Sequence, residues 1–192
     1  NNLEKLGLFT RNLEKMASHK GSLLGNIPNI KQPSQKLFES LIYKNLRELN
    51  LKSKIFIESE SSKIGNLYVP NGLLNKIKTC HTIKINASIN ERIKFLLHDY
   101  KAYITEKDSF KDLFKHAKTK LSKDILNNWE QLYKKKNWKL LAYYLITDYY
   151  DPLYSHNLKL TKGTTLKSYN LSSLSQQSLS KFCLKLKEDL IL

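Results

Sequence analysis

Cysteine is nearly absent from this 192-residue sequence, which contains only Cys80 and Cys183. The two lie far apart and neither belongs to a C-x-x-C pair, which excludes a disulfide scaffold and a zinc ribbon. Two lone cysteines are most simply small buried hydrophobic residues. The sequence also lacks an apolar run of the roughly 20 residues that cross a bilayer, and no signal peptide opens it. We therefore expect a cytoplasmic protein with no membrane partner.

Arginine is scarce although the sequence is strongly basic. The net charge is +16, yet only Arg11, Arg47 and Arg92 among the 33 basic residues are arginine. Such an excess of positive charge indicates a polyanionic partner, first of all nucleic acid. Because bidentate recognition favours arginine, the lysines indicate a diffuse field rather than a set of specific readers. A basic surface that only faces solvent is the alternative.

The first half of the chain alternates between two periodicities. Short apolar or β-branched runs at residues 8–13, 54–58 and 82–85 are typical of strands, and the last two resemble strands buried on both faces. Between and after them, Ser34, Pro70 and Ser88 stand where amphipathic helices would begin, and Ser88 with Glu91 matches a capping box. Alternating strands and helices predict an α/β fold with a parallel sheet and crossover helices.

The second half is helical in pattern from about residue 110 to 150, and Pro152 is expected to end this block. Residues 111–139 carry nine lysines against three acids. A short strand at 166–171 and a last helix, capped by Ser173 or Ser175, follow. We predict three parts: an α/β core at 1–108, a basic helical block at 109–160 and a strand-helix appendage at 161–192.

The stretch KIFIESESSKIG, residues 54–65, places Glu58 and Glu60 at the end of an apolar strand. In nucleotide-binding sheets a carboxylate at this edge holds Mg²⁺ directly or through water. The alternative is a strand end whose acids are solvated or paired with lysine. The phosphate-binding partner motif G-x-x-x-x-G-K-[ST] does not occur in the sequence.

Five motifs in order resemble the C-terminal P-loop domain of the tRNA 2-selenouridine synthase family. They are NLEKMASHKGSLLG, QPSQKLFESLI, IFIESESSKIGNLYVP, INERI and YYDPLY, and together they extend over nearly all of the chain. Asn12 and Lys20 depart from the family's usual Asp and Arg. The resemblance implies a P-loop NTPase-like fold.

The resemblance also implies parts and chemistry beyond these residues. The family carries a rhodanese-like domain with a reactive cysteine and a P-loop ahead of the matching region. Met16 is the only methionine, so Asn1 is not a translation start, and we expect a truncated chain. The implied reaction converts wobble 2-thiouridine of tRNA to 2-selenouridine through an S-geranylated intermediate, with selenophosphate and geranyl diphosphate as substrates. Partners would be tRNA and the rhodanese-like domain.

By this resemblance, one set of residues would bind phosphate or diphosphate: His19, Lys20, Gly21, Ser22, Ser34, Gln35, Glu58, Glu60, Ser61, Gly65 and Arg92. Glu58 would also bind Mg²⁺. From the concentration of lysine in residues 111–139, we expect Lys134, Lys135 and Lys136 to bind tRNA. Structural alternatives remain for several of them: a glycine turn at 19–22, a helix cap for Ser34, and an ion pair of Arg92 with Asp99. No catalytic residue is assigned. Two rival functions are a remnant of a nucleotide-dependent phosphotransferase and a non-catalytic RNA-binding domain.

Overall fold

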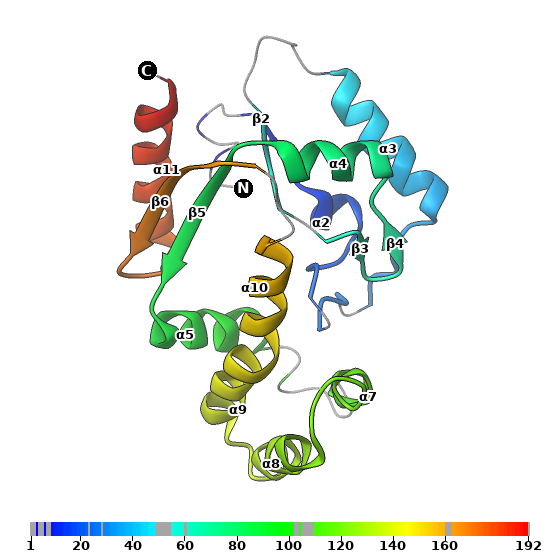
Figure 1. The fold of residues 1–192 in the computed structure, drawn as a ribbon, viewed down its shortest axis with the longest axis vertical. Helices are drawn as coiled ribbons and strands as arrows, with labels where there is room; N and C mark the ends of the chain where they lie inside the picture. The colour runs from blue at the N-terminus through cyan, green and yellow to red at the C-terminus, as the bar shows by residue number, and fades with distance from the viewer. Residues whose placement is uncertain are drawn as a thin grey trace. The chain divides into compact units, whose positions relative to one another are not determined.

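The computed structural model describes residues 3, 6, 9–22, 24–27, 29–48, 55–59, 61–101, 104, 110–159 and 163–191 (Figure 1). These fall into two compact units. Unit 1 comprises Asn1–Thr82, Lys162–Leu166 and Ser175–Leu192, and unit 2 comprises Ile83–Thr161 and Lys167–Leu174. The predicted three-part division of the chain stays a prediction.

Unit 1 begins with a parallel crossover. Strand β1 (Phe9–Arg11) pairs in parallel with β2 (Ile55–Ile57), and the helices α2 (Leu13–Met16) and α3 (Gln35–Arg47) lie between them in the chain. Ser34 begins α3 as predicted, because its hydroxyl accepts a hydrogen bond from the Leu37 N–H at 3.2 Å. The predicted α/β class, with parallel strands joined by helices, is confirmed.

A short hairpin follows β2 in the chain. Strands β3 (Lys63–Ile64) and β4 (Leu67–Tyr68) pair antiparallel around a turn in which Gly65 has a φ of +58°. Helix α4 (Asn71–Thr79) begins directly after Pro70, as the sequence indicated. In the described residues the strands form three two-stranded sheets rather than one continuous sheet.

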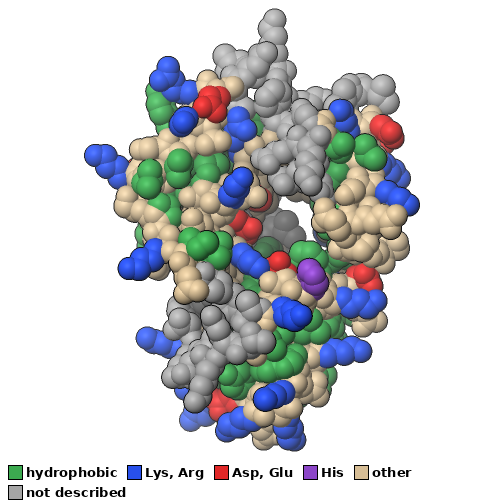
Figure 2. Space-filling view, turned by 180° about the vertical axis from the view of Figure 1, so that it is seen from behind, with side chains coloured by type: hydrophobic (Ala, Val, Ile, Leu, Met, Phe, Trp, Pro, Cys, Tyr) green, Lys and Arg blue, Asp and Glu red, His purple; other side chains and the backbone are tan. Residues whose placement is uncertain are grey.

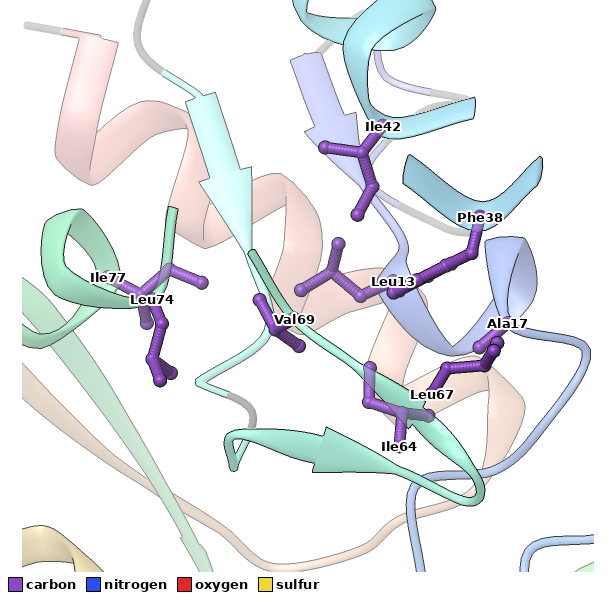
Figure 3. Packing of buried hydrophobic residues seen from close by; sticks show 9 residues of the cluster. All are labelled: Leu13, Ala17, Phe38, Ile42, Ile64, Leu67, Val69, Leu74 and Ile77. Carbon is purple, nitrogen blue, oxygen red and sulfur yellow. The ribbon is translucent and has the colours of Figure 1, made fainter. Parts of the chain in front are cut away.

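The core of unit 1 lies where α2, α3, α4 and the hairpin meet (Figure 3). Leu13 and Phe38 are almost completely buried at its centre, and Ile64 and Leu67 approach them from the hairpin. Each such side chain contributes about 1.5–3 kcal/mol to stability on burial. This core therefore holds the turn after α2 and the turn of the hairpin in fixed positions relative to each other. Both turns contain predicted site residues.

Strands β5 (Thr82–Ala87) and β6 (Thr165–Leu171) lie mostly in unit 2, where they pair with each other and run in the same direction (Figure 1). Helix α5 (Ile89–Asp99) starts where the capping box predicted, since the Ser88 hydroxyl accepts from the Glu91 N–H. The Glu91 carboxylate does not complete the box. It binds Lys94 and the Leu174 N–H instead, and these contacts hold the pKa of Glu91 below its ordinary value.

The rest of unit 2 is helical, as predicted. It contains α7 (Lys111–Ala117), α8 (Lys123–Lys134), α9 (Trp138–Tyr144), a π-helical segment η1 (Leu145–Tyr150) and α10 (Asp151–Lys159). The prediction that Pro152 ends the block is wrong, because helix continues through it. Pro152 is the second residue of α10, where its missing N–H is tolerated, and the preceding π-helical segment changes the hydrogen-bond spacing at the junction.

The chain ends with α11 (Gln176–Ile191), in unit 1. Ser175 caps it, as its hydroxyl accepts from the Ser178 N–H at 3.3 Å. Phe182, Cys183 and Leu186 are buried on one face of this helix. Within the described part of the chain, no helix is both long enough and apolar enough to span a bilayer.

Candidate functional site

The turn after α2 places His19 inside unit 1. The His19 N–H donates to the Glu14 carbonyl at 3.0 Å, and the Lys20 N–H donates to the Gly25 carbonyl at 2.8 Å, which closes a tight loop. Gly21 has a φ of +68°, so the loop turns in the left-handed region that suits glycine. Its N–H donates to Nδ1 of His19 at 3.1 Å. A neutral ring in this arrangement carries its proton on Nε2, which is then a hydrogen-bond donor.

Two glycines make room for the His19 ring. A Cβ on Gly25 would lie 2.5 Å from His19 Cε1, and a Cβ on Gly65 would lie 2.7 Å from His19 Cδ2. Real Cβ atoms do not approach so closely, so both positions require glycine. The side chain of His19 is accordingly 4% exposed. Two predicted site residues from distant parts of the chain, His19 and Gly65, are therefore in direct contact.

Gln32 joins this contact through its amide. Its Nε2 donates to the carbonyls of Ala17 at 3.1 Å and Ile64 at 3.0 Å, while its Oε1 accepts from the Asn66 N–H at 2.7 Å. The side chain thus ties the turn after α2 to the hairpin, within reach of Gly65. Gln32 is not among the site residues predicted from the sequence. Its position at the start of the QPSQ motif was the available signal.

Gln35 has a related role. Its amide pairs with the backbone of Tyr68, accepting from the N–H and donating to the carbonyl, both at 2.9 Å, and it also donates to Glu39. Both polar atoms of Gln35 are therefore engaged by the protein, and Ser34 is engaged as the cap of α3. These two predicted phosphate ligands lie at the start of α3 and hold the hairpin and the helix in place.

Glu58 follows strand β2 and contacts the N-terminal end of α2, whereas His19 follows the C-terminal end of this helix. Its Oε2 accepts a hydrogen bond from the Leu13 N–H at 2.8 Å, so the carboxylate sits at the N-terminus of α2. A negative charge is stabilised there by the free N–H groups of the helix. The Ser61 hydroxyl donates to the Lys63 carbonyl at 2.7 Å and shapes the loop before β3. The prediction for Glu60 falls outside the described residues.

Arg92 belongs to unit 2 and forms a bidentate ion pair. Its Nη1 donates to Oδ2 of Asp151 at 2.9 Å, and its Nη2 donates to Oδ1. The carboxylate raises the pKa of Arg92 further above its ordinary value. The structure thus shows an ion pair for Arg92, as one alternative anticipated, but its acid is Asp151 of the YYDPLY motif rather than Asp99. Two of the five family motifs meet here.

Lys134, Lys135 and Lys136 are also in unit 2, at the end of α8, and all three side chains are exposed. Lys136 has a φ of +53° and ends the helix in the left-handed conformation that glycine usually takes. On the face shown in Figure 2, lysines surround apolar side chains in the lower part of the molecule, where α8 and α9 lie in Figure 1. The lysines therefore present a positive surface, as the charge pattern predicted.

The burial of His19 gives a testable pH dependence. Burial lowers the pKa of His19 below its ordinary value of 6.5, so below this pH the unfolded chain binds a proton more readily than the folded one. The free energy of unfolding should therefore be highest above about pH 6.5 and fall as the pH drops below it. Urea unfolding at about pH 5 and pH 7.5 measures this loss. His19→Asn should reduce the loss of unfolding free energy between these two pH values. His98→Asn, at an exposed position, is the control and should leave this loss unchanged.

Residues 9–142 match the sequence model of a family described as tRNA 2-selenouridine synthase AAA domain. The chain belongs to this family. An AAA domain is compatible with the P-loop-like fold that the resemblance implied, and the family assignment made from the five motifs is confirmed.

Curated relatives agree with the family. A tRNA 2-selenouridine synthase of Alcanivorax borkumensis is 28% identical over 182 residues, which cover 80% of this chain and 50% of the relative. Another, of Nitrosomonas europaea, is 30% identical over 91 residues, covering 46% of this chain and 23% of the relative. The chain thus spans at most about half the length of these relatives. No solved structure matches it.

Proposed function

We propose that this chain binds the tRNA and the geranyl diphosphate of a wobble-uridine modification. In that reaction 2-thiouridine becomes 2-selenouridine through an S-geranylated intermediate, and selenophosphate is the selenium donor. Membership of a tRNA 2-selenouridine synthase family supports a role in tRNA modification. The prenyl chemistry and the assignment of residues to it are our inference from the family resemblance and the geometry of unit 1.

The contact of His19 with Gly65 carries the diphosphate half of the proposal. It brings the HKGS turn and the hairpin turn of the ESESSKIG segment together, and Gln32 locks them. In geranyl transfer the sulfur of 2-thiouridine would attack C1 of the geranyl group, and diphosphate would leave with the electron pair of the C–O bond. The Lys20 ammonium and the Ser22 hydroxyl would bind the negative charge that develops on that leaving group. His19, which Gly25 and Gly65 enclose, would hold this turn in position through its Nδ1. In this assignment Ser34, Gln35 and Gly65 support the site without contacting the ligand.

Mg²⁺ would bind here together with the diphosphate, rather than in a site made of protein side chains alone. In the part of the chain that the structure describes, no three His, Cys, Asp or Glu side chains group as a metal centre. Mg²⁺ on a diphosphate needs only one or two protein carboxylates, because phosphate oxygens and water complete the shell. Glu58 would supply one such carboxylate, and the ion would neutralise charge on the diphosphate.

Glu58→Gln tests this assignment. The amide oxygen of glutamine can still accept from the Leu13 N–H, so we expect a loss of stability of only about 0.5–1 kcal/mol from the weaker helix cap. The Mg²⁺-dependent part of geranyl diphosphate binding should disappear, because an uncharged amide is a poor magnesium ligand. Calorimetric titration with and without Mg²⁺ measures this difference. A variant that unfolds while its folded fraction binds geranyl diphosphate normally would show that the acid is structural.

The lysines of unit 2 carry the tRNA half of the proposal. Lys134, Lys135 and Lys136 are adjacent and exposed, and residues 111–139 hold nine lysines against three acids. Lysine neutralises phosphates without reading bases, so this surface would bind many tRNAs alike. The arginine of unit 2, Arg92, is paired with Asp151 and stabilises the fold in this assignment.

Reversing the three lysines to glutamate tests the tRNA surface. The variant should bind tRNA more weakly, and the slope of log affinity against log salt should become shallower by about 2, since each lost phosphate contact releases about 0.7–0.9 fewer counterions. Filter binding at several salt concentrations measures both effects. Lys36, Lys76 and Lys78, also exposed and reversed together, change the net charge equally and serve as the control. Equal losses in both variants would argue against a localised tRNA surface.

A further inference from the structure

A pocket lies between α7 and α8, entirely within unit 2. Its volume is ≈ 400 Å³, in the lower part of the range of about 300–1,000 Å³ typical of small-molecule sites. The rings of Phe110, Phe114 and Tyr133 form a wall that is mostly apolar, and the pocket opens to solvent. Charged side chains complete the lining: Lys115, Lys118, Glu130 and Lys134. The site proposed above for the diphosphate, in unit 1, does not include any of these residues.

The aromatic wall is held in position from behind. Phe110 is 5% exposed and stacks on Trp138, with ring centroids 5.8 Å apart and planes at 18°. Tyr133 contacts Phe110 at 5.2 Å and Trp138 at 5.6 Å, and Phe114 meets Tyr133 edge to face at 5.9 Å. Phe114 and Tyr133 are themselves only half-buried. Two rings are thus presented to the pocket on a packed aromatic support, which keeps their orientation fixed without a ligand.

The charges around the wall restrict the chemistry of a ligand. Three lysines and one glutamate line the pocket, and Lys135 and Lys136 continue the positive surface beyond the end of α8. A simple anion would leave the aromatic wall unfilled, and an uncharged alkyl group would leave the lysines without partners. A nucleotide satisfies both, because its base has two flat faces for stacking and its phosphates are negative. Glu130 can accept a hydrogen bond from an N–H group of the base.

We propose that this pocket stacks an unpaired base of the bound RNA on Phe114 and Tyr133, while Lys115, Lys118 and Lys134 bind the flanking phosphates. The inference rests on the proposed tRNA binding and deepens it, since a lysine surface alone would bind duplex and single strands alike. The pocket makes unit 2 selective for RNA with a base turned out of its helix. A wobble uridine lies in a loop, and such bases are available for stacking.

The test uses the 192-residue chain and a single-stranded RNA that contains one 2-aminopurine, whose fluorescence is quenched on stacking. Phe114→Leu and Tyr133→Leu remove one ring each and keep an apolar side chain. Each should weaken binding about tenfold, as expected for one stacked base, and reduce the quenching. The salt slope should stay unchanged, because no phosphate contact is lost. Tyr43→Leu removes an exposed ring of unit 1 and should change neither the affinity for the RNA nor the quenching.

A second variant keeps the test valid if the leucine variants fold poorly. Lys118→Gln leaves the rings in place, so it should keep the quenching while the salt slope becomes shallower by about 0.7. RNA that binds without quenching overturns the stacking inference and leaves the proposed tRNA binding intact. A Phe114-dependent affinity for geranyl diphosphate with unquenched RNA would instead identify a prenyl pocket and also overturn it. A chain that does not bind any RNA contradicts both proposals.

Discussion

Replacing Gly65 with alanine is expected to destabilise unit 1 strongly. The new Cβ would lie 2.2 Å from Oε1 of Gln32 and 2.7 Å from Cδ2 of His19, at a φ of +58°. The left-handed conformation alone costs a non-glycine residue about 1–2 kcal/mol, and the clash comes in addition because Gln32 is fixed by three hydrogen bonds. We expect a loss of about 2 kcal/mol or more in the free energy of unfolding, measured by urea denaturation.

Gly72→Ala is the matched control for this prediction. Nothing lies within 4 Å of the position that its Cβ would take, and Gly72 is in helix α4 with ordinary helical backbone. Alanine should therefore leave the stability unchanged or raise it by about 0.5–1 kcal/mol. If the two variants had equal stability, the described packing of His19, Gln32 and Gly65 would be incorrect.

The chain on its own is expected to form neither geranylated nor selenated uridine. In the reaction that we propose, selenium transfer would require an activated thiolate, yet Cys183 is buried on α11, and burial raises the pKa of its thiol above the ordinary value. Cys80, at the end of α4, is only partly exposed. The sequence also lacks the glycine loop whose N–H groups would supply much of the grip on a diphosphate. The rhodanese-like domain that the family resemblance implies would supply the thiolate.

Mass analysis of nucleosides checks this expectation. The 192-residue chain is incubated with 2-thiouridine tRNA, geranyl diphosphate and selenophosphate, and the tRNA is then digested. A full-length tRNA 2-selenouridine synthase serves as the positive control. Multiple turnovers of either product by the chain alone would show that the active site has been misplaced, and Cys80→Ser would then be the first variant to examine.

Local signals in the sequence were read correctly because their causes are local. Ser34, Ser88 and Ser175 each cap the helix predicted for them, since a cap depends only on the next three residues. The apolar runs at β1, β2 and β5 became strands for the same reason. The expectation that β2 and β5 are buried on both faces is wrong, because each pairs in a two-stranded sheet and Ile55 and Ile85 are 41% and 51% exposed. The family could be predicted because five motifs occur in the same order as in its members. A single motif would not have been specific enough.

The long-range contacts that assemble the candidate site could not be predicted from the sequence. Glu58 binds the N–H of Leu13, 45 residues earlier, and Arg92 pairs with Asp151, 59 residues later. Nothing in the spacing of the sequence selects such partners. Gln32 was overlooked because a glutamine in a loop has no pattern of its own. The prediction that Pro152 ends the helical block failed because a π-helical segment precedes this proline and makes it acceptable there. No known sequence pattern predicts such a segment.

Titrating the chain separately with tRNA and with geranyl diphosphate shows whether it binds both ligands, as we propose. ATP is the third ligand, because a phosphotransferase remnant would favour it. We predict salt-sensitive tRNA binding, weak binding of geranyl diphosphate that His19→Ala reduces and inorganic diphosphate competes with, and no binding of ATP. If tRNA alone binds, the chain is a non-catalytic RNA-binding domain, and if ATP binds in preference to geranyl diphosphate, the proposed function is wrong.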